Sequence, residues 1–166
     1  YNIHFGAGPD PARMAPGSEW VDRIAEMIRA QNPDVVALQE VLAGGAQSRF
    51  VNQRKRLAER TGYTILYKEA QFAWGVSSGI ALLTRHPVLE ERLVEVMAAG
   101  AVPVPDARKT EHAERRLAQA ARIHVPGFEP MWFVNTHFHS GHPLNRRPNF
   151  DALQSRLVGT LSGPVV

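Results

Sequence analysis

The chain has 166 residues, a net charge of +3 at pH 7 and no cysteine, and 44% of its residues are hydrophobic. This composition is typical of a globular protein with its own core, and the absence of cysteine excludes disulfides, thiolate catalysis and cysteine-based zinc sites. No apolar run reaches the roughly 18 residues that a membrane helix needs, so we expect no membrane span. The basic balance favours anionic partners such as phosphate esters or nucleic acid.

The first part of the chain alternates strand and helix patterns. Tyr1–Phe5 alternates in polarity, which predicts a strand, and Gly6–Gly17 is rich in proline and glycine, which predicts a loop. Ser18–Gln31 has apolar residues at helical spacing behind a serine that can cap a helix. The short apolar run Val35–Leu38 predicts a buried strand, and a second helix is expected over Arg49–Arg60.

The rest of the chain consists mostly of strand patterns. Ala98–Glu111 is expected to be a loop, a helix is expected to begin at Asn149, and Gly163–Val166 has the pattern of a beginning strand. This mixture of elements predicts the α/β (α+β) class, with sheets flanked by helices. The expected strands are Tyr63–Tyr67, Gly79–Leu83, Val88–Val96, Ala118–Val125 and Met131–His137.

Two polar residues in the first part are candidates for a metal site. Glu40 follows the buried run that ends at Leu38, where a carboxylate is firmly held, and carboxylate oxygens are ligands that Mg²⁺ prefers. Asn2 lies on the face of the first strand opposite Ile3, where its amide could support a metal ligand or contact phosphate. By spacing alone, an ordinary solvated side chain is the favoured interpretation of each.

Polar residues also end the apolar strand that begins at Met131. Asn135, Thr136 and His137 follow one another there, and polar groups at a strand end often line a site at the sheet edge. The imidazole of His137 could donate a hydrogen bond to a phosphoryl oxygen. A structural role for this histidine is the alternative.

Together these segments resemble the endonuclease/exonuclease/phosphatase (DNase I-like) superfamily, in four places and in the right order. The resemblance implies a two-layer β-sandwich flanked by helices. It also implies metal-dependent hydrolysis of a phosphodiester or phosphomonoester, of the nuclease type or of the lipid or small-molecule phosphodiesterase type. The segments that carry it are Tyr1–His4, Pro33–Val41, Gly79–Pro87 and Val134–His137, with a weaker likeness at Glu114–Arg116.

The resemblance implies a role for particular residues of this chain. Glu40 would bind Mg²⁺, or Mn²⁺ in its place, and Asn2 would help to position the metal or the phosphate. His137 would stabilise the charge that grows on the phosphoryl oxygens. The residues expected to contact the substrate are Asn135, Arg116 and His139.

The chain departs from the family pattern at its end. A Gly-Asp-x-Asn segment and a later Asp-His pair complete the family's site, and neither is found by Val166. We therefore expect residues 1–166 to be the N-terminal portion of a single domain, incomplete at its C-terminus and inactive by itself. A soluble monomer is expected, and neither a cytoplasmic nor a secreted location is favoured.

Two alternatives stay open. His137, His139 and His142 have the spacing of the zinc ligands of metallo-β-lactamase-like hydrolases, although Gly141 stands where that family has an aspartate. The other alternative is a non-catalytic relative that keeps the fold and binds phosphate-bearing partners.

Overall fold

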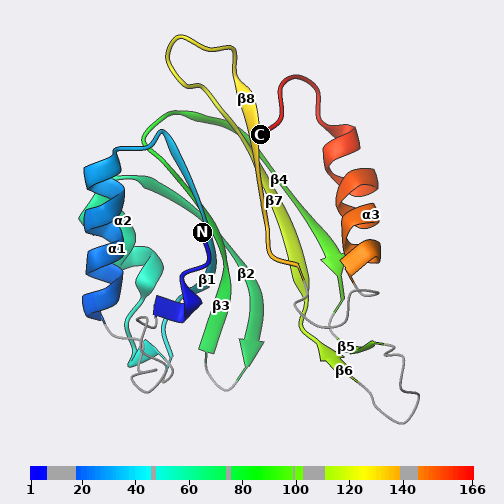
Figure 1. Ribbon diagram of the computed structural model, residues 1–166, viewed down its shortest axis with the longest axis horizontal. Coiled ribbons are helices and arrows are strands. Elements are labelled where there is room, and N and C mark those ends of the chain that lie inside the picture. The colour runs from blue at the N-terminus through cyan, green and yellow to red at the C-terminus, as the bar shows by residue number, and fades with distance from the viewer. Residues whose placement is uncertain (7–17, 46–47, 74–75, 99, 103–110, 139–145) are drawn as a thin grey trace. The chain divides into compact units, whose positions relative to one another are not determined.

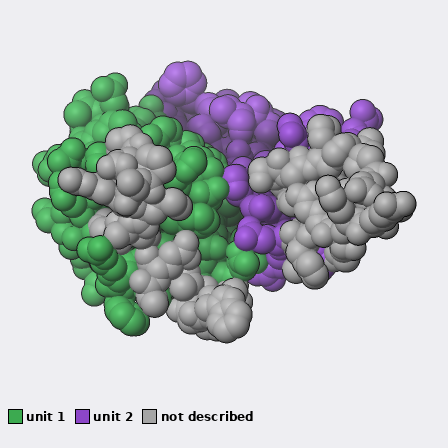
Figure 2. Space-filling model, turned by 60° about the horizontal axis from the view of Figure 1, so that its bottom comes forward, with its two compact units in different colours: residues 1–87 green, residues 88–166 purple. Residues whose placement is uncertain are grey.

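The computed structural model describes residues 1–6, 18–45, 48–73, 76–98, 100–102, 111–138 and 146–166. The chain forms two compact units, residues 1–87 (unit 1) and 88–166 (unit 2), which Figure 2 distinguishes by colour. Each unit has its own sheet and its own core (Figure 1). None of the helices in these described ranges is long and apolar enough to cross a membrane.

Unit 1 contains a three-stranded antiparallel sheet in the order β1-β3-β2. Asn2 pairs with Gln39 of β1 in parallel, on the edge of β1 that faces away from β3. The elements are the 3₁₀ turn η1 (His4–Gly6), α1 (Ser18–Gln31), β1 (Val35–Leu42), α2 (Gln53–Thr61), β2 (Thr64–Ala73) and β3 (Val76–Thr84).

Both helices of unit 1 cover the same face of this sheet (Figure 1). The apolar residues of α1 recur at helical spacing, so that Val21 and Ile28 are buried together with Leu57 of α2 against the sheet. A two-pronged ion pair joins the helices, because the Nε and Nη2 atoms of Arg56 each lie 2.6 Å from a carboxylate oxygen of Asp22. The interface therefore has an apolar centre and a charged rim.

Unit 2 contains a second antiparallel sheet, in the order β4-β7-β8, and a separate β5–β6 hairpin. Helix α3 packs Leu153 and the following Leu157 against Trp132 of this sheet. Val165 forms a parallel bridge with Trp132, so a strand does begin at the chain end, as predicted. The elements are β4 (Val88–Met97), β5 (Gly100–Val102), β6 (Glu111–Ala113), β7 (Arg116–Ile123), β8 (Met131–Thr136), α3 (Arg146–Arg156) and the 3₁₀ turn η5 (Val158–Thr160).

The structure confirms the α/β class and the bounds of α1, but it corrects two boundaries in unit 1. The first strand does not reach Phe5, because His4 and Phe5 have left-handed φ angles of 47° and 56° that turn the chain away. The second helix does not begin at Arg49, which also has a positive φ. It begins at Gln53, after Asn52, whose side chain accepts a hydrogen bond from the Lys55 backbone N–H.

Unit 2 also differs from its prediction. Asn149 does not cap α3 but lies inside it, buried, and its side-chain nitrogen donates to the sulfur of Met97. Phe150, which the apolar spacing after Asn149 predicts to lie on the inner face of this helix, is instead 45% exposed. The expected loop Ala98–Glu111 contains β5 and the start of β6. Trp74, His139 and His142 lie outside the described residues.

A cluster of polar residues closes unit 1 at the start of β1. The Arg85 guanidinium donates to Asp34 Oδ1 (2.7 Å) and to Asn32 Oδ1 (2.5 Å), and the His86 ring lies 2.8 Å from the same Asp34 oxygen. Hydrogen bonds from Arg85 and then His86 hold the pKa of the Asp34 carboxyl below its usual 3.8. The Arg-His dipeptide after β3 therefore ties β3 to the start of β1.

We expect Asp34→Asn to lower the unfolding temperature at pH 7. Because the pKa of Asp34 is lowered by folding, its stabilising effect is present above pH 3.8 and is lost as the pH falls through the lower folded value. The deficit of the variant, measured by thermal unfolding, should therefore shrink on acidification. The matched control is Asp151→Asn, which removes an exposed pair with Arg147 and should change little. A deficit that persists unchanged below pH 3 would contradict this account.

Candidate active site

Glu40 does not follow β1 but lies inside it, at a β-bulge. Gln39 pairs with Ile80 and Val41 pairs with Gly79, so that Glu40 is the extra residue of β1. Its φ angle is 60°, in the left-handed region, where a residue with a side chain loses about 1–2 kcal/mol. Bulges redirect side chains out of the regular strand alternation, and strained residues of this kind cluster at functional sites.

Gly79 of β3 lies between this bulge of β1 and an irregularity in β2. The neighbouring strand β2 has its own irregularity between Glu69 and Gln71, so that bulges on both sides face Gly79. A Cβ atom on Gly79 would lie 2.0 Å from the backbone oxygen of Lys68, which no side chain allows. The glycine that begins the Gly79–Pro87 motif is therefore required by the close approach of the backbones.

The Asn2 side chain lies against Glu40. Its Nδ2 donates to Glu40 Oε1 at 2.9 Å, while its Oδ1 accepts a hydrogen bond from the His4 backbone N–H at 2.8 Å. A backbone N–H can only donate, so this second contact fixes which end of the amide faces the carboxylate. The structure thus brings these two predicted residues together, with the amide of Asn2 orienting the carboxylate of Glu40.

This pair suits an oxygen-binding divalent cation such as Mg²⁺ or Mn²⁺ better than a zinc ion in a closed site. Mg²⁺ keeps several of its waters and is commonly held by one or two carboxylates together with substrate phosphates. Within the described parts of the chain, no group of three or more histidine, aspartate or glutamate side chains could enclose a metal. A single oriented carboxylate therefore fits the open coordination of Mg²⁺ and does not resemble a closed zinc site.

The other predicted site residues belong to unit 2. Asn135 is 2% exposed and pairs across the sheet with Gln119, which is also buried. Trp132 and Val134 pack toward α3, so the strand alternation places Asn135 on the opposite face. His137 comes directly after β8 and is half-buried.

Arg116 is not brought to the face that carries Asn135. It precedes Ala118 by two residues on β7, and Ala118 packs in the cluster with α3, so Arg116 shares the α3 face of the sheet. Its guanidinium Nη2 lies 3.3 Å from a carboxylate oxygen of Glu114. Substrate contact by Arg116, Asn135 and His139 stays a prediction.

Gln53 was missed by the sequence analysis, which placed it inside an exposed helix. The residue is 1% exposed, and its side chain forms hydrogen bonds with the backbone of Leu42 and of Phe5. A signal existed: Gln53 precedes the core residue Leu57 by four positions and so shares its helix face. The same helix holds Arg56, which pairs with Asp22.

The sequence profile of the endonuclease/exonuclease/phosphatase family matches residues 1–164 of this chain. The chain belongs to this family. Members of the endonuclease/exonuclease/phosphatase family are hydrolases that act on phosphate esters, and they generally use divalent metal ions. The match confirms the resemblance found in the sequence and decides against the metallo-β-lactamase alternative.

Solved structures show the same fold. An endonuclease/exonuclease/phosphatase from Beutenbergia cavernae is 24% identical with a TM-score of 0.64, over 97% of this chain and 42% of its own length. A mannosyl-6-phosphatase from Bacteroides thetaiotaomicron is 18% identical with a TM-score of 0.68, over 99% of this chain and 60% of its own. Truncated TDP2 from Caenorhabditis elegans is 18% identical with a TM-score of 0.58, over 87% and 51%.

These matches show the fold and how much of each solved chain this chain covers. The chain spans 42–60% of the length of these three solved chains. A comparison with curated proteins finds no match.

The left-handed backbone of Glu40 can be tested by comparing two variants that both remove the carboxylate. Glycine adopts a φ of 60° without steric penalty, whereas alanine does not. We therefore expect Glu40→Gly to be more stable than Glu40→Ala by about 1 kcal/mol in denaturant unfolding. Elsewhere in a strand the order is reversed, so a more stable alanine variant would show that the bulge is not strained.

Proposed function

We propose that this protein hydrolyses phosphate esters with a divalent cation, Mg²⁺ or Mn²⁺, held by Glu40. The observation that carries the proposal is the hydrogen bond from Asn2 to Glu40 at a strained bulge, because a fold keeps such strain where a side chain must be presented. Membership in the endonuclease/exonuclease/phosphatase family supports the same reaction class.

Each residue of the proposed site has a distinct task. A bound divalent cation polarises the phosphoryl group and neutralises its charge. Glu40 holds that cation, and Asn2 orients the carboxylate as outer partners of metal ligands commonly do. His137 donates a hydrogen bond to a phosphoryl oxygen in the transition state, as an oxyanion donor does. Asn135, Arg116 and His139 are proposed to contact the substrate.

Two substrate classes are compatible with the chain. The net charge of +3 favours an anionic substrate, and a nucleic acid is one such partner. The related fold of a mannosyl-6-phosphatase makes a phosphomonoester of a sugar an equal candidate. Specificity in such folds lies in loops around the site, so both substrate types belong in an assay.

In the full-length protein that carries this segment, we expect Glu40→Ala to abolish Mg²⁺-dependent hydrolysis while the protein stays folded, because the cation loses its carboxylate ligand. The assay follows release of p-nitrophenol from its phosphodiester and its phosphomonoester as Mg²⁺ is titrated. The matched control is Glu26→Ala, which removes an exposed carboxylate of α1. Unchanged turnover in Glu40→Ala would exclude the assigned site. Failure of the unmodified full-length protein to hydrolyse either ester would favour the non-catalytic alternative.

A further inference from the structure

Among the described residues, no named strand pairs with β1 on the edge opposite β3, and isolated bridges join that region to Asn2 and, after β1, Ala43 to Asn52. Tyr1–Ile3 runs beside β1 on that edge, where the Gln39 N–H donates to Tyr1 O and the Ile3 N–H donates to Gln39 O, both at 3.1 Å. The chain then turns away, because His4 and Phe5 take left-handed φ angles. The pairing therefore ends just where the bulge at Glu40 begins.

At Leu42, a side chain takes the place of a neighbouring strand as hydrogen-bond partner of the backbone. The Ala43 N–H donates to Ser77 O of β3, so the preceding N–H, that of Leu42, points to the opposite edge. There it donates to Gln53 Oε1 at 2.9 Å. An unsatisfied N–H at this buried position would destabilise the fold, so the side chain of Gln53 supplies the acceptor that the Leu42 N–H needs.

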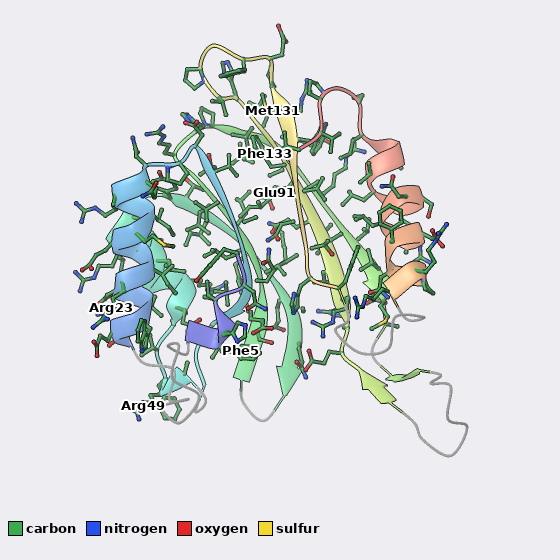
Figure 3. The ribbon with its side chains drawn as sticks, viewed as in Figure 1. Phe5, Arg23, Arg49, Glu91, Met131 and Phe133 are labelled. Atoms are coloured by element: carbon green, nitrogen blue, oxygen red, sulfur yellow. The ribbon has the colours of Figure 1, made fainter. Side chains whose placement is uncertain are left out.

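The other end of the Gln53 side chain bonds the turn after Asn2. Its Nε2 donates to the Phe5 carbonyl oxygen at 2.5 Å. One partner can only donate and the other can only accept, so the orientation of the amide is fixed. The carboxamide of Gln53 thus substitutes for a peptide group and bridges the end of β1 to η1. Figure 3 shows Phe5 in this turn and Arg49 in the loop after β1, at the same end of unit 1.

This bridge connects the two segments that carry the proposed site. Leu42 follows Glu40 by two residues, and Phe5 follows Asn2 by three. The position of Gln53 is fixed, because it is the first residue of α2, directly after the N-cap Asn52, and is buried. Gly6 leaves it room, since a Cβ atom there would lie 2.6 Å from Gln53 Nε2.

We propose that Gln53 is a positioning residue that sets the separation of Asn2 and Glu40 and, through them, the affinity of the site for a divalent cation. The inference rests on the proposed function, since it concerns the same cation. Gln53 touches neither the cation nor the substrate and acts through the backbone of Leu42 and Phe5. Outer partners of metal ligands typically change affinity by about 10–100-fold, and this more remote bridge should act at the lower end.

The test is calorimetric titration of Mn²⁺ into the whole protein and its variants. Gln53→Met keeps the length of the side chain but removes both hydrogen bonds, and we expect its dissociation constant for Mn²⁺ to rise about tenfold. Leu57→Val, on the same helix face, is the control for a loss of packing and should leave the constant within about twofold. Exchange of the Asn2 side-chain amide protons, followed by NMR, should become faster only in the Gln53 variant.

A second variant keeps the test decisive if Gln53→Met does not fold. In Gln53→Glu, one carboxyl oxygen can still accept from Leu42, but only the protonated acid can donate to Phe5. Burial raises the pKa of such a carboxyl, so the loss of affinity relative to the unmodified protein should shrink as the pH is lowered. A loss that does not depend on pH would contradict the bridge.

The outcomes separate the two proposals. Tight Mn²⁺ binding by the unmodified protein with equal binding by Gln53→Met would overturn the role of Gln53 and leave the proposed function standing. No Mn²⁺ binding by the unmodified protein would overturn both. Weaker binding in the Gln53 variant alone supports both.

Discussion

The hydrogen bond from the Asn2 amide to the Glu40 carboxylate is the interaction on which the proposed site depends. It joins two segments that are 38 positions apart in the sequence, and it forms only because Tyr1–Ile3 lies in parallel beside β1. The His4 N–H holds the other end of the amide, so the carboxylate meets a donor of fixed direction. A side chain held in this way loses little entropy when it binds a cation.

The backbone around this pair accepts strain so that one side chain can be presented. Glu40 has a left-handed φ in the middle of a strand, and two facing bulges meet at Gly79. The opposite end of the sheet has the reverse character, because Asp34, Arg85 and His86 close it with charged hydrogen bonds. In unit 1, charged hydrogen bonds stabilise the start of β1, and the bulge lies toward its other end. Stability gained at one place can offset the strain of a functional site elsewhere.

Local sequence signals predicted much of this arrangement. The bounds of α1 followed from apolar spacing and from the capping position of Ser18, and the buried run at Val35 located β1. Glu40 and Asn2 were proposed as neighbours because of a family resemblance. The structure places the two side chains in hydrogen-bond contact, and their metal-binding role stays a proposal.

The features that the sequence did not predict depend on contacts between segments that are distant in the sequence. The bulge at Glu40 is defined by the pairing of β1 with Ile80 and Gly79 of β3, and no pattern within β1 reveals it. Gln53 looks like part of a charged helix, and its role exists only because the chain turns away at His4. Asn149 has the residue type of a cap, but burial against Met97 decided its position instead.

The central claim is that Glu40 holds a divalent cation. The most direct measurement is paramagnetic broadening of the protein's NMR signals by substoichiometric Mn²⁺, since the effect depends steeply on distance from the ion. The account predicts that the side-chain amide of Asn2 and the backbone amides next to Glu40 broaden first. First broadening at the Asp34 cluster or at the acidic residues of β4, with the Asn2 signals unaffected, would contradict it.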